Sequence, residues 1–178
     1  FKIPIGISVA KTNNPSILGD KALEDYANGF STLHHLGSYT TVNVSCPSSF
    51  DNNTCTYGNH EYLPKLLKRL DKCKHNKPVF LKIRPDHSLK ELDSILKIAA
   101  PYKWVTGFIM GNLNKDRSDL HYKSRLDSIC KSGGLSGLPT KEPSNRLLAH
   151  AYKKAHKRFV FIGCGGIFSA EDAYEKIL

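Results

Sequence analysis

The stretch VFLKIRP, residues 79–85, places one lysine inside an otherwise apolar run. Its first five residues, VFLKI, have the length and composition of a buried β-strand, and Lys82 is the only charged residue among them. An ammonium group that is buried without a partner is costly. We therefore expect Lys82 to point into a polar site at the end of this strand rather than into the hydrophobic core.

Strand-like runs and helical patterns alternate along the whole chain. The strand candidates are 3–10, 39–44, 78–83, 105–111 and 159–165, and the helical patterns are 19–36, 60–75, 88–102, 143–157 and a last one that opens at Ser169. Ser88 and Ser169 each precede an acidic residue by three positions, the spacing of a capping box, and Ser144 is a third N-cap candidate. Strands separated by helices predict βαβ units and a parallel sheet.

Two α/β architectures fit this order. Five units make either a complete doubly wound sheet or five-eighths of a (β/α)8 TIM barrel, for which ~156 of a barrel's ~250 residues are needed. The 178 residues fit the barrel if the segment 112–142 is one long loop.

Residues with chemical function stand at the carboxyl ends of all five strand candidates, and this favours the barrel, because the carboxyl ends of barrel strands meet at one mouth. They are Ser8, Asn43 with Cys46 and Ser48, Lys82, Asn112, and Gly165 with Gly166. We predict a single domain, residues 1–178, that holds five consecutive barrel strands.

The composition is that of a globular protein, with 40% hydrophobic and 10% aromatic residues. No apolar run approaches the ~18 residues of a membrane-spanning helix. The five cysteines have no metal-ligand spacing, so we expect reduced thiols, a cytosolic setting and no metal site. Because the chain opens on Phe1 within a strand-like run, we expect it to be a fragment.

The formal net charge of +10 suggests a polyanionic partner at first sight. Much of this charge lies in two helical segments, KLLKRLDKCKHNK and AYKKAHKR. Neither segment has the interleaved aromatic residues of a base-stacking platform. We therefore interpret them as solvated helix faces and expect no nucleic-acid partner.

Two glycine-rich stretches indicate an anion site. SGGLSG (132–137) and GCGG (163–166) both offer backbone N–H groups, and the second precedes a helix start. Together they suit a phosphate group, which binds to backbone N–H groups and helix N-termini. Their place after the last strands of a barrel is a recurrent place for phosphate binding.

The stretch VNVSCPSS (42–49) raises the question whether Cys46 is a reactive base or an inert filler. A thiol becomes a base when its pKa falls from the free value of ~8.5. Asn43 and Asn112 offer paired donors and acceptors that suit a planar ligand with amide-like edges. A thiol, two amides, an inward lysine and a phosphate site are what an enzyme using flavin mononucleotide (FMN) requires.

The order IGISVAK, VNVSCPS, FLKIRPD, GNLNKDRS, GGLSG, IGCGG resembles the class 2, quinone-dependent dihydroorotate dehydrogenases over nearly the whole chain. The resemblance implies FMN-dependent oxidation of dihydroorotate to orotate in pyrimidine biosynthesis, with quinone as the electron acceptor. It also implies that the chain holds about strands 3 to 7. The first two strands, the last one and the N-terminal membrane-associating helices would lie outside it. The expected location is the cytoplasm, peripheral on the inner membrane through that absent segment.

The resemblance also implies a role for individual residues. Cys46 takes the position of the catalytic base, which is serine in class 2 and cysteine in class 1. The positions that correspond to cofactor-binding residues are Ser8, Asn43, Lys82, Gly111, Gly137 and Gly166. The positions that correspond to substrate-binding residues are Asn43, Ser48, Asn112 and Leu113.

Several positions depart from the family pattern. Ser8 and Ser48 each stand where the family carries asparagine, and GNL (111–113) replaces T-N-T or T-N-S. Two other functions therefore remain open at this point. One is a tRNA dihydrouridine synthase-like flavoenzyme, which would share the N-x-x-C-P loop and the K-I-R strand. The other is a degenerate barrel that binds a ligand or partner without turnover.

Overall fold

The computed structural model describes residues 3–44, 62–114, 116 and 134–177. Five parallel strands form one sheet: β1 (Gly6–Val9), β2 (Tyr39–Asn43), β3 (Val79–Ile83), β4 (Val105–Met110) and β5 (Val160–Gly163). Their order in the sheet, β1-β2-β3-β4-β5, is their order in the chain. A doubly wound sheet reverses its strand order at a switch point, whereas a barrel does not. Within the described part, the topology is therefore that of a barrel.

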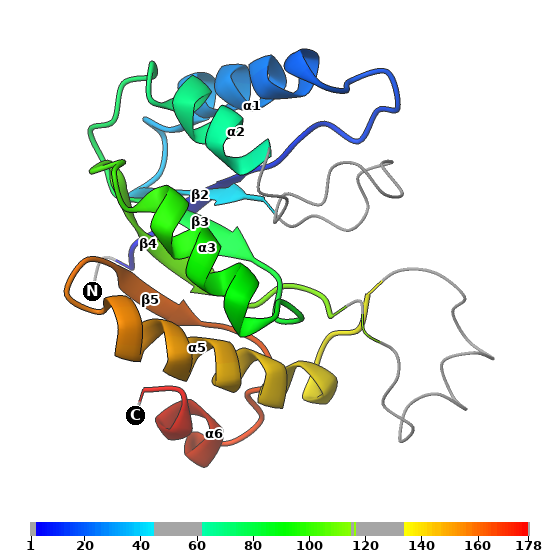
Figure 1. Ribbon diagram of the computed structural model, residues 1–178, viewed down its shortest axis with the longest axis vertical. Helices are drawn as coiled ribbons and strands as arrows, with labels where there is room; N and C mark the ends of the chain where they lie inside the picture. Colours follow the sequence, from blue (N-terminus) through cyan, green and yellow to red (C-terminus); the bar gives the residue numbers. More distant parts are fainter. Residues whose placement is uncertain (1–2, 45–61, 115, 117–133, 178) are drawn as a thin grey trace.

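The helices alternate with the strands along the chain. They are α1 (Asp20–Leu33), α2 (Tyr62–Leu70), α3 (Leu89–Ala99), α5 (Lys141–Ala155) and α6 (Ala170–Glu175), with a 3-10 turn, η1 (Leu138–Thr140), before α5. Along the sheet α1 packs on α2, α2 on α3 and α3 on α5 (Figure 1). None of the helices in the described ranges is long and apolar enough to span a membrane.

Both predicted capping boxes are confirmed. Ser88 accepts a hydrogen bond from the backbone of Glu91, and Ser169 accepts one from Asp172, with the acidic side chain bonded back in each case. The prediction for Ser144 is wrong. Helix α5 begins three residues earlier, at Lys141, and Ser144 is fully buried in its first turn. Its hydroxyl lies 3.0 Å from the carbonyl oxygen of Met110 and 3.2 Å from that of Cys164.

The hydrophobic core lies between the helices and one face of the sheet. In β3 this face carries Val79, Leu81 and Ile83, each at most 1% exposed. The helices contribute leucines and aromatic residues that repeat at helical spacing: Tyr26, Phe30, Leu63, Leu66, Leu67, Leu70, Leu92 and Leu147. Burial of this apolar surface provides most of the driving force for folding.

The opposite face of the sheet carries the side chains that alternate with those of the core. One row across the strands joins Asn43, Lys82, Ile109 and Ile162, and a second joins Ser8, Thr41, Phe80, Gly107 and Val160. In a closed barrel this face is the interior. At β5 it is uncovered within the described residues, since Val160 is 54% and Ile162 37% exposed. Lys82 therefore lies on the face away from the helices, as the sequence predicts.

Candidate active site

Two of the predicted amide side chains meet at the carboxyl end of the sheet. Asn43 is the last residue of β2, and Asn112 lies two residues beyond β4. The Asn112 Nδ2 donates a hydrogen bond to the Asn43 Oδ1 at 3.1 Å, although 69 residues separate them in sequence. At its backbone, Asn43 accepts a bond of 2.8 Å from the Tyr26 hydroxyl of α1. The fold thus assembles one amide cluster from two strand ends.

Lys82 and Ser8 occupy the same inner face. Lys82 pairs with Asn43 in the register between β2 and β3, so the lysine and the amide are side by side in one row, and Lys82 is half-buried. Ser8 is exposed and pairs with Thr41, which places it one row closer to the amino end of the sheet. The structure therefore brings Asn43, Lys82 and Asn112 together, and Ser8 stands at their margin.

Gly111 lets the ends of β4 and β5 approach closely. Its φ of 150° is in the region that favours glycine, and a Cβ there would lie 2.1 Å from the carbonyl oxygen of Cys164. The Cys164 N–H also donates to the carbonyl oxygen of Met110 at 3.1 Å. A threonine, as in the family pattern, would not fit this backbone. The glycine in GNL therefore allows β4 and β5 to approach each other closely at their carboxyl ends.

Leu113 lies against the first glycine stretch. Its backbone N–H donates to the Asn112 Oδ1 at 2.9 Å. Asn114 and Leu135 exchange two backbone hydrogen bonds of 2.8 and 2.7 Å. A Cβ at Gly134 would lie 2.5 Å from the Cβ of Leu113. Gly134 and Leu135 are therefore fixed against the loop that carries Asn112.

Gly137 of the first glycine stretch and Gly165 of the second lie together, as predicted, since both contact Thr140. Gly137, Gly165 and Gly166 all have positive φ, at 78°, 93° and 68°. A Cβ at Gly165 would lie 2.7 Å from the Oγ1 of Thr140, and one at Gly166 would lie 2.6 Å from the Cα of Lys141. Backbone that lacks side chains and leads into helix starts has the character of an anion cradle.

The two remaining predicted residues, Cys46 and Ser48, lie outside the described residues. Conversely, the sequence reasoning missed three residues around Gly165 and Gly166, which we call the glycine turn. They are Thr140, Lys141 and Asp172. The Lys141 Nζ donates to the Asp172 Oδ1 at 2.7 Å. This pairing raises the pKa of Lys141 and lowers the pKa of Asp172 to about 2. The only sequence signal was the SAED capping box, which identifies Asp172 but not its partner.

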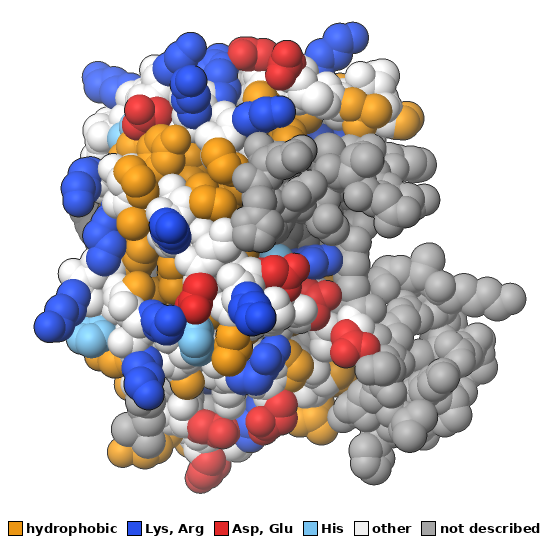
Figure 2. All heavy atoms as spheres, in the orientation of Figure 1, with side chains coloured by type: hydrophobic (Ala, Val, Ile, Leu, Met, Phe, Trp, Pro, Cys, Tyr) orange, Lys and Arg blue, Asp and Glu red, His pale blue; other side chains and the backbone are white. Residues whose placement is uncertain are grey.

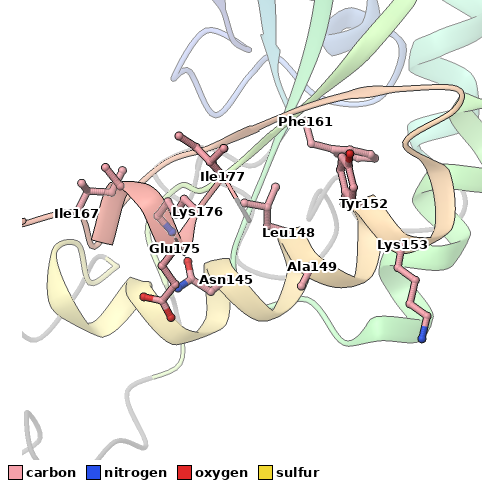
Figure 3. Close-up of a pocket in the computed structure, with 12 residues that line it drawn as sticks. Asn145, Leu148, Ala149, Tyr152, Lys153, Phe161, Ile167, Glu175, Lys176 and Ile177 are labelled. Atoms are coloured by element: carbon pink, nitrogen blue, oxygen red, sulfur yellow. Dashed lines mark hydrogen bonds between the residues drawn. The ribbon is translucent and has the colours of Figure 1, made fainter. Parts of the chain in front are cut away.

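A cavity of about 630 Å³ lies elsewhere, on the outer side of the sheet between α5 and α6 (Figure 3). Its wall is mainly apolar, with Leu148, Tyr152, Phe161, Ile167 and Ile177, and Asn145 and Lys176 stand at one end. The Lys176 Nζ donates to Ser144 and Asn145, and burial lowers the pKa of Lys176. Because the sheet separates this cavity from the amide cluster, it is not the predicted active site.

Basic side chains do not gather into one surface patch on the face that Figure 2 shows. Lys and Arg side chains are spread over the helices, with acidic and hydrophobic side chains between them. Several are paired, as in the bidentate contact of Arg69 with Glu24 at 2.6 and 2.7 Å. This distribution fits the solvated helix faces expected from the sequence.

The profile of one protein family, dihydroorotate dehydrogenase, matches residues 1–178. Two similar proteins are the dihydroorotate dehydrogenases (quinone) of Gloeobacter violaceus and Rippkaea orientalis. The first is 32% identical over 98% of this chain and 47% of its own length, and the second is 33% identical over 99% and 47%. The chain thus spans about half the length of these curated relatives.

Solved structures of similar fold come from the dihydroorotate dehydrogenase (DHODH) of Eimeria tenella. The ligand-free enzyme has a TM-score of 0.80 at 22% identity, over 98% of this chain and 51% of that one. The complex with ferulenol has a TM-score of 0.75 at 22% identity, over 87% and 45%. These likenesses and the unbroken strand order confirm the prediction of a partial (β/α)8 barrel. The match over residues 1–178 favours this family over the tRNA dihydrouridine synthases. The chain therefore belongs to the dihydroorotate dehydrogenase family.

Proposed function

We propose that the complete protein is an FMN-dependent dihydroorotate dehydrogenase that oxidises dihydroorotate to orotate in pyrimidine biosynthesis. The observation that carries this proposal is the amide cluster. Asn43 and Asn112 are hydrogen-bonded to each other at the mouth of the partial barrel, and Lys82 lies in the same row as Asn43. Active sites of TIM barrels lie at this end of the strands.

The residues present fit FMN. Gly165 and Gly166 have positive φ angles, and no side chain of their own covers their backbone N–H groups, which suits this turn to bind the phosphate group of FMN. Gly137 is the N-cap of the 3-10 turn that leads into α5, and its carbonyl oxygen accepts a hydrogen bond from Thr140, which contacts Gly165. Lys82 would lie beside the flavin ring, with Gly111, Asn43 and Ser8 at its edge. When bound, FMN supplies the acceptor for a hydride.

The chain's own residues supply positioning and the proton acceptor. Asn43 and Asn112 orient the planar amide edges of the substrate, since each amide offers one acceptor and two donors. Ser48 and Leu113 would complete the substrate pocket. Lys82 places a positive charge where negative charge develops during the reaction, the usual electrostatic contribution of an active site.

Cys46 acts as the general base in this proposal. Oxidation of dihydroorotate breaks the C6–H and C5–H bonds and forms the C5=C6 double bond. The hydride leaves from C6, and the Cys46 thiolate takes the proton from C5. A thiol needs a pKa depression of ~1.5 units to be half-ionised near neutral pH, a smaller change than a serine hydroxyl requires.

Quinone is the proposed electron acceptor, and the support is the name of the curated relatives, dihydroorotate dehydrogenase (quinone). The proposed location is the cytoplasm, peripheral on the inner membrane, where quinone is available. Contact with the membrane would be made by a part of the protein outside the sequence described here. No nucleic-acid partner is proposed.

The experiment that tests the proposal uses the complete, purified protein. We expect a yellow protein whose flavin absorbance is bleached by dihydroorotate without oxygen and returns on addition of a quinone. A yellow protein that dihydroorotate does not bleach would support the degenerate barrel instead. Reoxidation by NAD or fumarate, with no response to quinone, would assign the protein to another class of the family.

A further inference from the structure

Lys141 contacts the glycine turn directly. It is the first residue of α5, and its backbone lies against Gly166. A Cβ at Gly166 would lie 2.6 Å from the Cα and Cβ of Lys141 and 2.8 Å from its N. The preceding residue, Thr140, makes the equivalent contact with Gly165, and its hydroxyl donates to the carbonyl oxygen of Gly137 at 2.8 Å. The start of α5 therefore supports both glycine stretches.

The side chain of Lys141 extends from this contact to α6. Its Nζ lies 2.7 Å from the Asp172 Oδ1 and 3.1 Å from the Glu175 Oε2. The other oxygen of Asp172 accepts backbone hydrogen bonds from Phe168 at 2.8 Å and Ser169 at 3.0 Å. One carboxylate thus holds both the Lys141 ammonium and the chain that leaves the glycine turn.

The charges in this cluster show what Lys141 is suited for. Its single positive charge faces two carboxylates, so little of it is available to a bound anion. Two other interactions do affect the glycine turn. The backbone of Lys141 packs against Gly166, and Asp172 accepts hydrogen bonds from the backbone just after the turn. Lys141 connects the two.

We propose that Lys141 is a positioning residue for the phosphate-binding turn: it fixes the backbone N–H groups around Gly166 in the orientation that binds the phosphate of FMN. This inference rests on the proposed function. It differs from a direct role, in which the lysine would be a ligand of the phosphate. It also differs from a merely structural role, in which Lys141 would stabilise the fold without affecting phosphate recognition.

The test compares the affinities of FMN and riboflavin, which differ only in the phosphate, for the complete protein freed of its flavin. In Lys141→Met we expect the dissociation constant of FMN to rise roughly tenfold, the size of one lost charge-assisted contact. The dissociation constant of riboflavin should stay the same. Lys141→Arg should restore most of the FMN affinity, because arginine also reaches both carboxylates. Lys154→Met is the matched control, since Lys154 lies at the far end of α5 and forms a 3.0 Å pair with Asp93 of α3.

Asp172→Asn separates positioning from charge. If Lys141 acted only by offsetting negative charge, removing the carboxylate would tighten FMN binding. Positioning predicts the opposite, because the variant weakens the link from Lys141 to the chain after Gly166. Weaker FMN binding in both variants, with unchanged riboflavin binding, is the expected result.

Three outcomes overturn the inference. They are an unchanged ratio of FMN to riboflavin affinity in Lys141→Met, an equal loss of both affinities, and tighter FMN binding in Asp172→Asn. A wild-type protein that shows no preference for FMN over riboflavin would overturn the phosphate site of the proposed function as well. A preference in the wild type that Lys141→Met retains would overturn the role of Lys141 alone.

Discussion

The two ends of the parallel sheet carry different chemistry. At the carboxyl end, Asn43, Lys82 and Asn112 meet on an open face beside glycines with positive φ. At the amino end, where the helices lead back into the strands, aromatic and imidazole rings pack against one another. In barrels, the first end serves catalysis and the second serves stability. Changes at the two ends should therefore have separable effects.

The amino end has a dense set of ring contacts. The ring of His34 stacks on Phe30 at 4.6 Å, and its Nδ1 lies 2.7 Å from the Thr40 hydroxyl. The ring of His75 stacks on Trp104 at 4.2 Å, and the Trp104 Nε1 donates to Asp71. Such packing makes this end sensitive to changes in volume. None of these residues lies in the amide cluster.

The largest expected effect is at the carboxyl end. Cys46→Ala should slow reduction of the flavin by dihydroorotate by ~10²–10⁴-fold, the usual contribution of a general base. FMN affinity and the urea midpoint should not change, since no stabilising role is assigned to the thiol. Stopped-flow absorbance measures the rate. Cys46→Ser should recover part of it, with the rate profile displaced to higher pH. A near wild-type rate in the alanine variant would identify Cys46 as a filler.

The amino end should show the reverse pattern. Phe30 is fully buried, and Phe30→Ala should lower the free energy of unfolding by ~3–5 kcal/mol through lost burial and a cavity. The fraction that remains folded should bind FMN as tightly as the wild type does. Urea unfolding and flavin titration of the complete protein measure the two quantities. A large loss of FMN affinity in the folded fraction would break the distinction between the two ends.

At the carboxyl end, Lys82→Met should slow flavin reduction less than Cys46→Ala does. The variant removes the positive charge beside Asn43, so flavin reduction should slow by about 10²-fold, as when one electrostatic donor is lost. Methionine keeps much of the side-chain volume, so thermal stability should stay the same or rise. A wild-type rate of reduction would show that Lys82 is a structural cation.

The parts of the fold and site that could be predicted from the sequence have local signals. Strand periodicity gave all five strands, and the charge inside VFLKIRP gave the face on which Lys82 lies. Ser88 and Ser169 were recognised as N-caps because Glu91 and Asp172 follow at the right spacing. At Ser144 the third residue onward is Leu147, which cannot complete a capping box. That difference was available in the sequence.

The parts that could not be predicted depend on how distant segments pack. The pairing of Lys141 with Asp172 joins residues 31 apart, and its geometry follows from the approach of α5 and α6. The hydroxyl of Ser144 reaches the ends of β4 and β5 for the same reason. The local sequence excludes a capping box at Ser144, but it does not identify the two carbonyl groups that the buried hydroxyl contacts. The roles of Cys46 and Ser48 stay predictions.

The smallest effect expected is a pH dependence of stability, to which two histidines of the amino end and one of the carboxyl end contribute. Burial lowers the pKa of His34 and of His75 below the ordinary value of about 6.5, and it also lowers the pKa of His87 after β3. Below that value the unfolded chain binds more protons than the folded one. The stabilising contribution is therefore complete above about pH 6.5 and is lost as the pH falls through the folded-state pKa.

His75→Phe tests this dependence, because phenylalanine keeps a ring against Trp104 and cannot titrate. We expect its free energy of unfolding to change less between pH 7.5 and 5.5 than that of the wild type, by at most ~1.4 kcal/mol per pH unit, the limit for one group. His156→Phe is the control, since His156 is exposed and its ring stacks on Tyr152 rather than on Trp104. Urea unfolding at several pH values gives the slopes.

The ratio of FMN to riboflavin affinity should be the same in both variants, because the imidazole of His75 lies at the end of the sheet away from the glycine turn. A change in that ratio would show that the two ends are coupled.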